Sequence, residues 1–169
     1  HISTSNPQTV IFGDSIMTNL TRSSVTTSRS WKNAKIALSG ISGDRVENVL
    51  YRIGTTSFPN SVTSIYIAVG TNNIFRNTPD EVVNTIIACV KAARTKAPGA
   101  VIKVQGILPR MFIEKNVQAK LTKINKSLKA HLSDEFVDPE TLFQKEGKNV
   151  LERRFTSQFE RQRCSLQTN

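Results

Sequence analysis

Residues 62–69 read VTSIYIAV and are followed at once by Gly70-Thr71-Asn72-Asn73. Such a run of β-branched and aromatic residues, ended by a glycine, is typical of a buried strand. Shorter apolar runs predict four more strands, over residues 9–12, 35–38, 101–105 and 135–137. Apolar residues at helical spacing predict helices between them, over residues 44–53, 79–96 and 116–132. This alternation predicts an α/β fold, a three-layer α/β/α sandwich around a parallel sheet.

The composition is that of one globular domain, with 38% apolar and 21% charged residues in a chain of 169. No apolar run approaches the ~20 residues that a membrane-spanning helix needs. The two cysteines, Cys89 and Cys164, form neither a disulfide framework nor a zinc-binding spacing, which favours a reducing, intracellular compartment. Cys89 falls in an apolar helical pattern and is interpreted as a buried core thiol. No metal or organic cofactor is expected.

The charge is strongly positive, because 23 basic and 13 acidic residues leave a net +10. Such a chain tends to associate with polyanions, either nucleic acid or an anionic membrane. The basic residues are spread along the sequence, and several lysines recur at three-residue spacing in the 116–132 helix and just before it. They form either a solvated helix face or a functional basic surface.

The polar segments that follow the predicted strands are small and rich in glycine. They are Gly13-Asp14-Ser15, residues 39–44, residues 70–73 and residues 106–110. Because the carboxyl ends of parallel strands meet at one edge of the sheet, these segments are expected to lie together. Ser15 would open a helix with its hydroxyl in the crevice, although Asp and Ser are also common helix caps. The backbone amides of Ser15 and Gly43 and the side-chain amide of Asn72 could then stabilise an oxyanion.

Three of these segments carry a family resemblance. Gly13-Asp14-Ser15, Ser42-Gly43-Asp44 and Gly70-Thr71-Asn72-Asn73 resemble, in order, the first three sequence blocks of the SGNH or GDSL hydrolases. Within that superfamily the chain is most similar to the catalytic subunits of intracellular platelet-activating-factor acetylhydrolase. Esterase-like domains of animal retroelements look similar too. The likeness runs from about residue 9 to residue 143.

The resemblance implies a flavodoxin-like fold of about five parallel strands and a serine esterase acting on small acyl esters. Ser15 would be its nucleophile, and Gly43 and Asn72 would complete the oxyanion hole. Asp14 would order the turn, and Arg110 would support the crevice. Since the resembled acetylhydrolase subunits pair, a homodimer is a further expectation.

The family's fourth block, an Asp-x-x-His near the C-terminus, is not found. The histidines are His1 and His131, and His131 is expected at the opposite edge of the sheet from Ser15. We therefore expect a flexible N-terminus over residues 1–8, a hydrolase-like domain over 9–143 and a divergent basic tail over 144–169, with the last helix degenerate or missing. The sequence predicts an esterase that is weak or inactive.

The alternative is a non-catalytic domain of the same fold that binds nucleic acid through its basic surface. A nucleotide-binding flavodoxin-like protein is disfavoured, because no strand end offers a glycine-rich phosphate loop.

Overall fold

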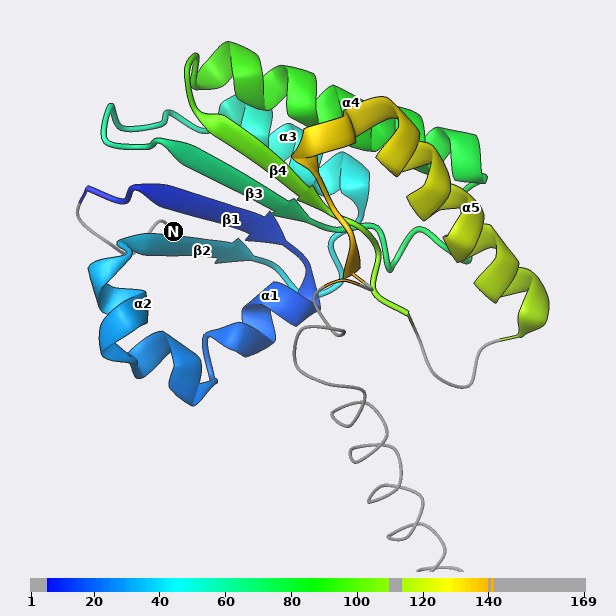
Figure 1. Cartoon of the computed structure of the whole chain (residues 1–169), viewed down its shortest axis with the longest axis horizontal. Coiled ribbons are helices and arrows are strands. Elements are labelled where there is room, and N and C mark those ends of the chain that lie inside the picture. Colours follow the sequence, from blue (N-terminus) through cyan, green and yellow to red (C-terminus); the bar gives the residue numbers. More distant parts are fainter. Residues whose placement is uncertain (1–5, 110–113, 140, 142–169) are drawn as a thin grey trace, which may run out of the picture. The chain divides into compact units, whose positions relative to one another are not determined.

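The strands form one parallel sheet in a computed structural model that describes residues 6–109, 114–139 and 141. Their order across the sheet is β2-β1-β3-β4-β5, the doubly wound arrangement of flavodoxin-like proteins (Figure 1). The five strands are β1 (Thr9–Gly13), β2 (Ile36–Gly40), β3 (Ser64–Ala68), β4 (Val101–Gln105) and β5 (Phe136–Val137). The predicted α/β fold with five parallel strands is confirmed.

The register of the three neighbouring strands β2, β1 and β3 brings their carboxyl ends level. Gly13 at the end of β1 pairs with Gly40 of β2 on one side and with Ala68 of β3 on the other. The loops that leave these strands therefore start side by side. This is the edge at which the sequence predicts that the polar segments gather.

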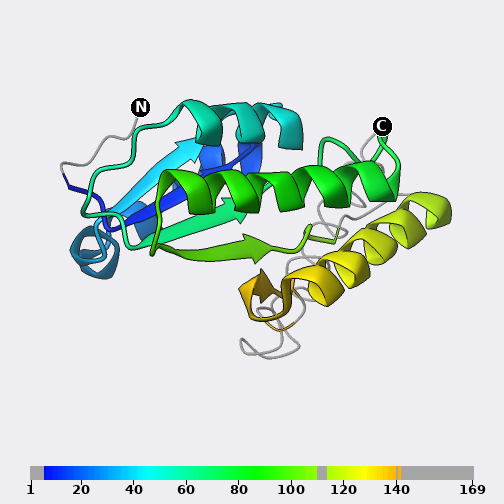
Figure 2. The same ribbon diagram turned by 90° about the horizontal axis from the view of Figure 1, so that it is seen from above.

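Three helices cover one face of the sheet: α3 (Val46–Thr55), α4 (Pro79–Lys96) and α5 (Lys115–Leu132). Figure 2 shows them lying side by side along the strands. Their apolar residues interlock with those of β1, β3 and β4 in one core, as the helical spacing predicts. Cys89 of α4 is fully buried there, and burial raises the pKa of its thiol to about 12.

The opposite face carries α1 (Ser15–Leu20) and α2 (Arg29–Asn33), joined through a 3-10 turn over Ser24–Thr27 (Figure 1). The sequence predicts that a helix opens at Ser15, but it does not predict α2 or the 3-10 turn. No residue of α2 is buried. A helix that buries no face needs no apolar periodicity, so the signal by which a helix is recognised is absent from this segment.

His1–Val137 is one compact unit, and the chain divides from a second unit at Asp138. In the second unit the structure describes residues 138, 139 and 141, where the Thr141 hydroxyl donates to the Asp138 carbonyl at 2.8 Å. The expected basic tail over 144–169 and the expected loss of a last helix lie outside the described residues. Among the helices that are described, none has the length and apolar character needed to span a bilayer.

Candidate active site

Ser15 is the first residue of α1 and is separated from β1 only by Asp14. The Asp14 side chain is 1% exposed, and its carboxylate accepts a hydrogen bond from the amide of Ile16 at 2.9 Å. Its carbonyl accepts one from the amide of Thr18 at 3.0 Å. Asp14 therefore orders the turn by capping the helix, as expected. Ser15 itself is half-buried at the start of that helix.

The helix that begins at Ser15 lies directly against the backbone of β2. A Cβ atom on Gly40 would come within 2.5 Å of the Thr18 nitrogen and 2.8 Å of the Met17 carbonyl carbon. No side chain fits between them, so this position requires glycine. The close approach of α1 to β2 holds Ser15 beside the loop that leaves β2.

That loop, residues 41–44, is tied to the end of β1. The Ile41 amide donates to the Gly13 carbonyl at 3.1 Å, and the Asp44 amide closes a turn onto the Ile41 carbonyl at 3.2 Å. Gly43 is exposed and has a φ of +83°, in the left-handed region that favours glycine. The loop carrying Gly43 therefore begins beside Gly13, which precedes Ser15 by two residues in the chain.

Two asparagines connect the loop after β3 to the loop after β2 and to α3. The Asn72 side-chain amide donates to the Asp44 carbonyl at 2.8 Å. The Asn73 side-chain oxygen accepts from the amide of Val46, the first residue of α3, at 3.0 Å. Asn73 is 2% exposed, so it satisfies a buried amide at the helix start from a distant part of the chain.

The same Asn73 side chain also acts as a donor. Its nitrogen lies 2.8 Å from a carboxylate oxygen of Glu47 and 3.0 Å from the side-chain oxygen of Asn77. Partial burial alone would raise the pKa of Glu47. Hydrogen bonds from its own backbone and from Asn73, with the charge of Arg45, outweigh that effect and lower the pKa below its ordinary value.

A cleft of about 350 Å³ opens at this edge of the sheet, and both Ser15 and Asn72 lie on its wall. The two residues come from the ends of different strands, β1 and β3. Gly43 belongs to the adjoining loop and does not itself line this cleft. The full lining consists of Ser15, Ile16, Thr71, Asn72, Leu108 and Pro109.

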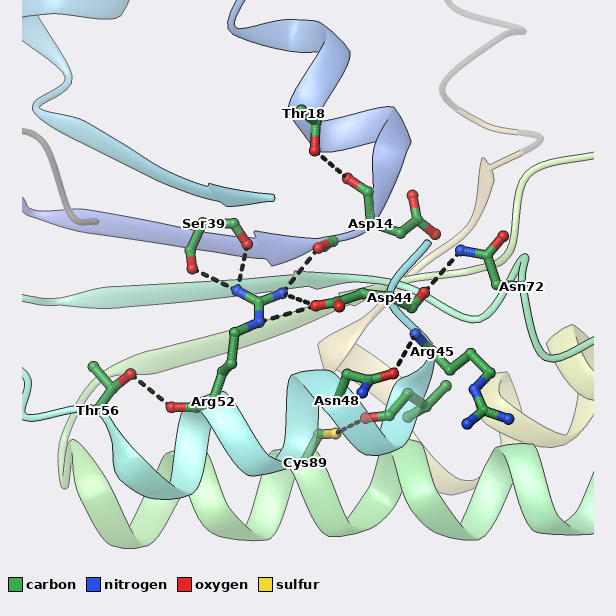
Figure 3. A network of polar contacts seen from close by, with 12 residues as sticks. Asp14, Thr18, Ser39, Asp44, Arg45, Asn48, Arg52, Thr56, Asn72 and Cys89 are labelled. Carbon is green, nitrogen blue, oxygen red and sulfur yellow. Dashed lines mark hydrogen bonds and ion pairs between the residues drawn. The ribbon is translucent and has the colours of Figure 1, made fainter. Parts of the chain in front are cut away.

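Arg52 is not among the predicted site residues, yet its guanidinium lies at the centre of the contacts among these loops (Figure 3). It pairs with Asp44 at 2.6 Å, and both side chains are largely buried. A signal was present in the sequence. Arg52 is a charged residue between the buried Val49 and Ile53 of α3, and Asp44 precedes the same helix. A buried arginine requires a partner of this kind.

The remaining predicted residues lie elsewhere. His131 is exposed in the last turn of α5, which leads to the amino end of β5, so it lies at the sheet edge opposite Ser15, as predicted. Its Nδ1 atom is 2.8 Å from the Ser127 carbonyl oxygen. Arg110 lies outside the described residues. Among the residues that are described, no group of three or more His, Cys, Asp or Glu side chains is placed to hold a metal ion.

Residues 11–157 match the model of the GDSL-like Lipase/Acylhydrolase family. Over 94 residues the chain is 37% identical to the platelet-activating factor acetylhydrolase IB subunit alpha2 of Homo sapiens, covering 55% of this chain and 41% of that protein. Over 86 residues it is 37% identical to the Drosophila melanogaster homolog of the beta subunit, covering 50% and 38%. The match thus spans about two fifths of the length of these relatives.

Solved structures share the fold. A GDSL-like lipase from Bacteroides thetaiotaomicron superposes with a TM-score of 0.67 at 19% identity, over 79% of this chain and 68% of that one. A psychrotrophic esterase from Pseudoalteromonas, solved with monoethylphosphonate as inhibitor, superposes with a TM-score of 0.61 at 15% identity, over 78% and 76%. These similarities concern the arrangement of the sheet and its helices.

Proposed function

The chain belongs to the GDSL-like lipase/acylhydrolase family, and from this premise we propose that it is an acyl-ester hydrolase domain with Ser15 as its nucleophile. The observation that carries the proposal is that Ser15 and Asn72 line one cleft from the ends of two adjacent strands. The apolar side chains of Ile16, Leu108 and Pro109 form much of the remaining wall of the cleft. An acyl group fits such surroundings.

The reaction follows from the placement of these groups. The Ser15 hydroxyl oxygen attacks the acyl carbonyl carbon, its proton passes to the departing alcohol, and the acyl-serine is then hydrolysed by water. The carbonyl oxygen becomes an oxyanion in each tetrahedral intermediate. In this proposal the backbone amides of Ser15 and Gly43 and the Asn72 side chain donate to it. Asn72 has two amide hydrogens, and its bond to the Asp44 carbonyl uses one of them.

Proton transfer is the weak point of the proposed reaction. The sequence contains no Asp-x-x-His, since His131 is preceded three positions earlier by Leu128. A serine hydroxyl without an adjacent base is a poor nucleophile at neutral pH. Binding and an oxyanion hole alone leave roughly 10³–10⁴-fold acceleration over water. We therefore propose that the chain is a weak or inactive member of its family, with slow ester hydrolysis at most.

The proposal is tested by reaction with a fluorophosphonate and with an activated acyl ester. A fluorophosphonate is chosen because it reacts with an activated serine without requiring turnover, and a phosphonate inhibits the Pseudoalteromonas esterase. We expect slow stoichiometric labelling, measured by intact-protein mass, and complete loss of labelling in Ser15→Ala. Ser57→Ala, which changes an exposed loop serine, should label at the parent rate. Labelling that persists in Ser15→Ala contradicts the assignment.

A second candidate function is polyanion binding, favoured by the charge of α5. This 18-residue helix contains five lysines and no carboxylate side chain. One face of it packs on the core, and the other face is exposed. Lys126 and Lys129 are exposed on it. The basic surface is therefore the proposed site for RNA or DNA in a domain that binds rather than catalyses.

Nucleic-acid binding of this kind should weaken steeply with salt. Each lysine that neutralises a phosphate contributes close to one unit to the slope of log K against log salt, so Lys126→Glu with Lys129→Glu should lower that slope by about two. Arg29→Glu with Lys32→Glu on α2, which reverses the same number of charges, is the matched control. Binding of a short duplex, measured by fluorescence anisotropy from about 50 to about 200 mM salt, provides the readout. A slope that is the same in the α5 variant and the control excludes this surface.

A further inference from the structure

We propose that Arg52 is a positioning residue that fixes the spacing of the three loops around the cleft. Its guanidinium donates to the Gly13 carbonyl, behind Ser15, at 3.0 Å. It donates to the Ser39 carbonyl at 2.7 Å and the Ser39 hydroxyl at 2.6 Å, near the end of β2. Figure 3 shows the guanidinium enclosed by these groups. One side chain thus connects the carboxyl ends of β1 and β2.

The third contact of the guanidinium extends the connection to the loop after β3. Arg52 donates through two nitrogens to the same carboxylate oxygen of Asp44, at 3.0 and 2.6 Å. The backbone carbonyl of Asp44 in turn accepts the side-chain amide of Asn72 at 2.8 Å. Gly43 is the residue immediately before Asp44. A continuous series of contacts therefore runs from Gly13 through Arg52 and Asp44 to Asn72.

The geometry of arginine is what makes this series possible. All three guanidinium nitrogens are engaged, and their N–H groups are divided among Asp44, Ser39 and Gly13. A lysine ammonium is a single point charge and cannot reach these acceptors together. The plane also lies against the ring of Phe12, with the guanidinium carbon 5.5 Å from the ring centroid. Phe12 is 1% exposed, so the arginine packs against a buried aromatic ring of the core.

Arg52 acts behind the cleft, since it is not among the residues that line it. Its proposed effect therefore concerns the alignment of Ser15, the Gly43 amide and Asn72, and it rests on the function proposed for them. A displacement of about 1 Å in such an arrangement can reduce a rate by about 10²-fold. Because no substrate contact is lost, the rate at saturation should fall while binding of the reagent is preserved.

The first experiment measures fluorophosphonate labelling of Arg52→Lys as a function of reagent concentration. We expect the maximal rate to fall by about 10–10²-fold, with the half-saturating concentration changed by less than about threefold. Arg29→Lys, at an exposed position of α2, should match the parent. In an Asn72→Ala background, Arg52→Lys should lose the part of its effect that acts through Asp44 on Asn72, because these residues form one contact series. Additive effects, or an unchanged maximal rate, overturn the proposal.

A second measurement does not depend on reactivity. The ¹⁵N–¹H resonances of the Asn72 side-chain amide should shift in Arg52→Lys and stay in place in Arg29→Lys. If Arg52→Lys does not fold, Asp44→Asn keeps the backbone carbonyl while weakening the pairing, and it should move the same resonances. A parent that never labels removes the proposed esterase function alone. Resonances that do not move in a folded variant overturn the role of Arg52, whatever the labelling shows.

Discussion

Asn73→Ala is expected to lower the free energy of unfolding by about 1–3 kcal/mol, since it leaves a buried amide without an acceptor. The amide is that of Val46 at the start of α3, and Val46 is fully buried. The variant also removes the donor that Glu47 and Asn77 share. Chemical denaturation followed by circular dichroism measures the loss. The helix α3 should show the earliest amide exchange, because its first turn loses its tertiary cap.

Two comparisons separate this cause from a general effect of substitution. Asn84→Ala, at an exposed position of α4, should change stability by less than about 0.5 kcal/mol. Asn73→Asp keeps an acceptor for Val46 but places a second carboxylate against Glu47. The pair raises the pKa of one carboxyl group, so the deficit of this variant should be large at neutral pH and shrink as the pH falls toward about 4. A deficit in Asn73→Asp that grows on acidification contradicts the contact.

The elements with local signals were predictable from sequence. The helix α4 occupies residues 79–96, as predicted, because Thr78 caps it, Pro79 fits its first turn and Pro98-Gly99 ends it. Prediction placed the start of α3 at residue 44, and the helix begins at Val46. The difference has a physical reason. The Asp44 carboxylate binds Arg52 instead of capping the helix. The amides at the helix start are accepted by the side chains of Asn48, in the first turn, and of Asn73, in another loop.

The candidate site was predictable in part, for the same reason. Periodicity and strand ends indicated which loops meet, and the structure brings Ser15 and Asn72 to one cleft. Apart from the contact of Asn73 with Asn77, the hydrogen-bonding partners of Arg52 and Asn73 named above are 8 to 39 residues away in the chain. Of these contacts, only the pairing of Arg52 with Asp44 leaves a local signal in the sequence, a charged residue on the buried face of α3. Residues that face the cleft are therefore easier to predict from the sequence than residues that hold the surrounding loops together.

Asn72→Ala is expected to reduce the rate of fluorophosphonate labelling by about 10²–10³-fold, the typical cost of one lost oxyanion donor. The reason lies in the position of Asn72 on the wall of the Ser15 cleft. Its stability effect should be small, about 1 kcal/mol, because the residue is half-exposed and makes one bond to the Asp44 carbonyl. Labelling kinetics and a denaturation curve on the same preparation measure both quantities.

Substitutions of the two neighbouring asparagines are thus expected to have opposite effects, one on stability and the other on reactivity. This contrast is the sharpest test of the site. Asn73 is 2% exposed and bonded on both sides, so its loss should affect folding. Asn72 faces the cleft, so its loss should affect reactivity. Asn72→Asp keeps the shape, removes the donors and adds negative charge, and should label even more slowly than Asn72→Ala. Labelling of Asn72→Ala at the parent rate, in a folded protein, would remove Asn72 from the proposed oxyanion hole and leave it the structural role of joining two loops.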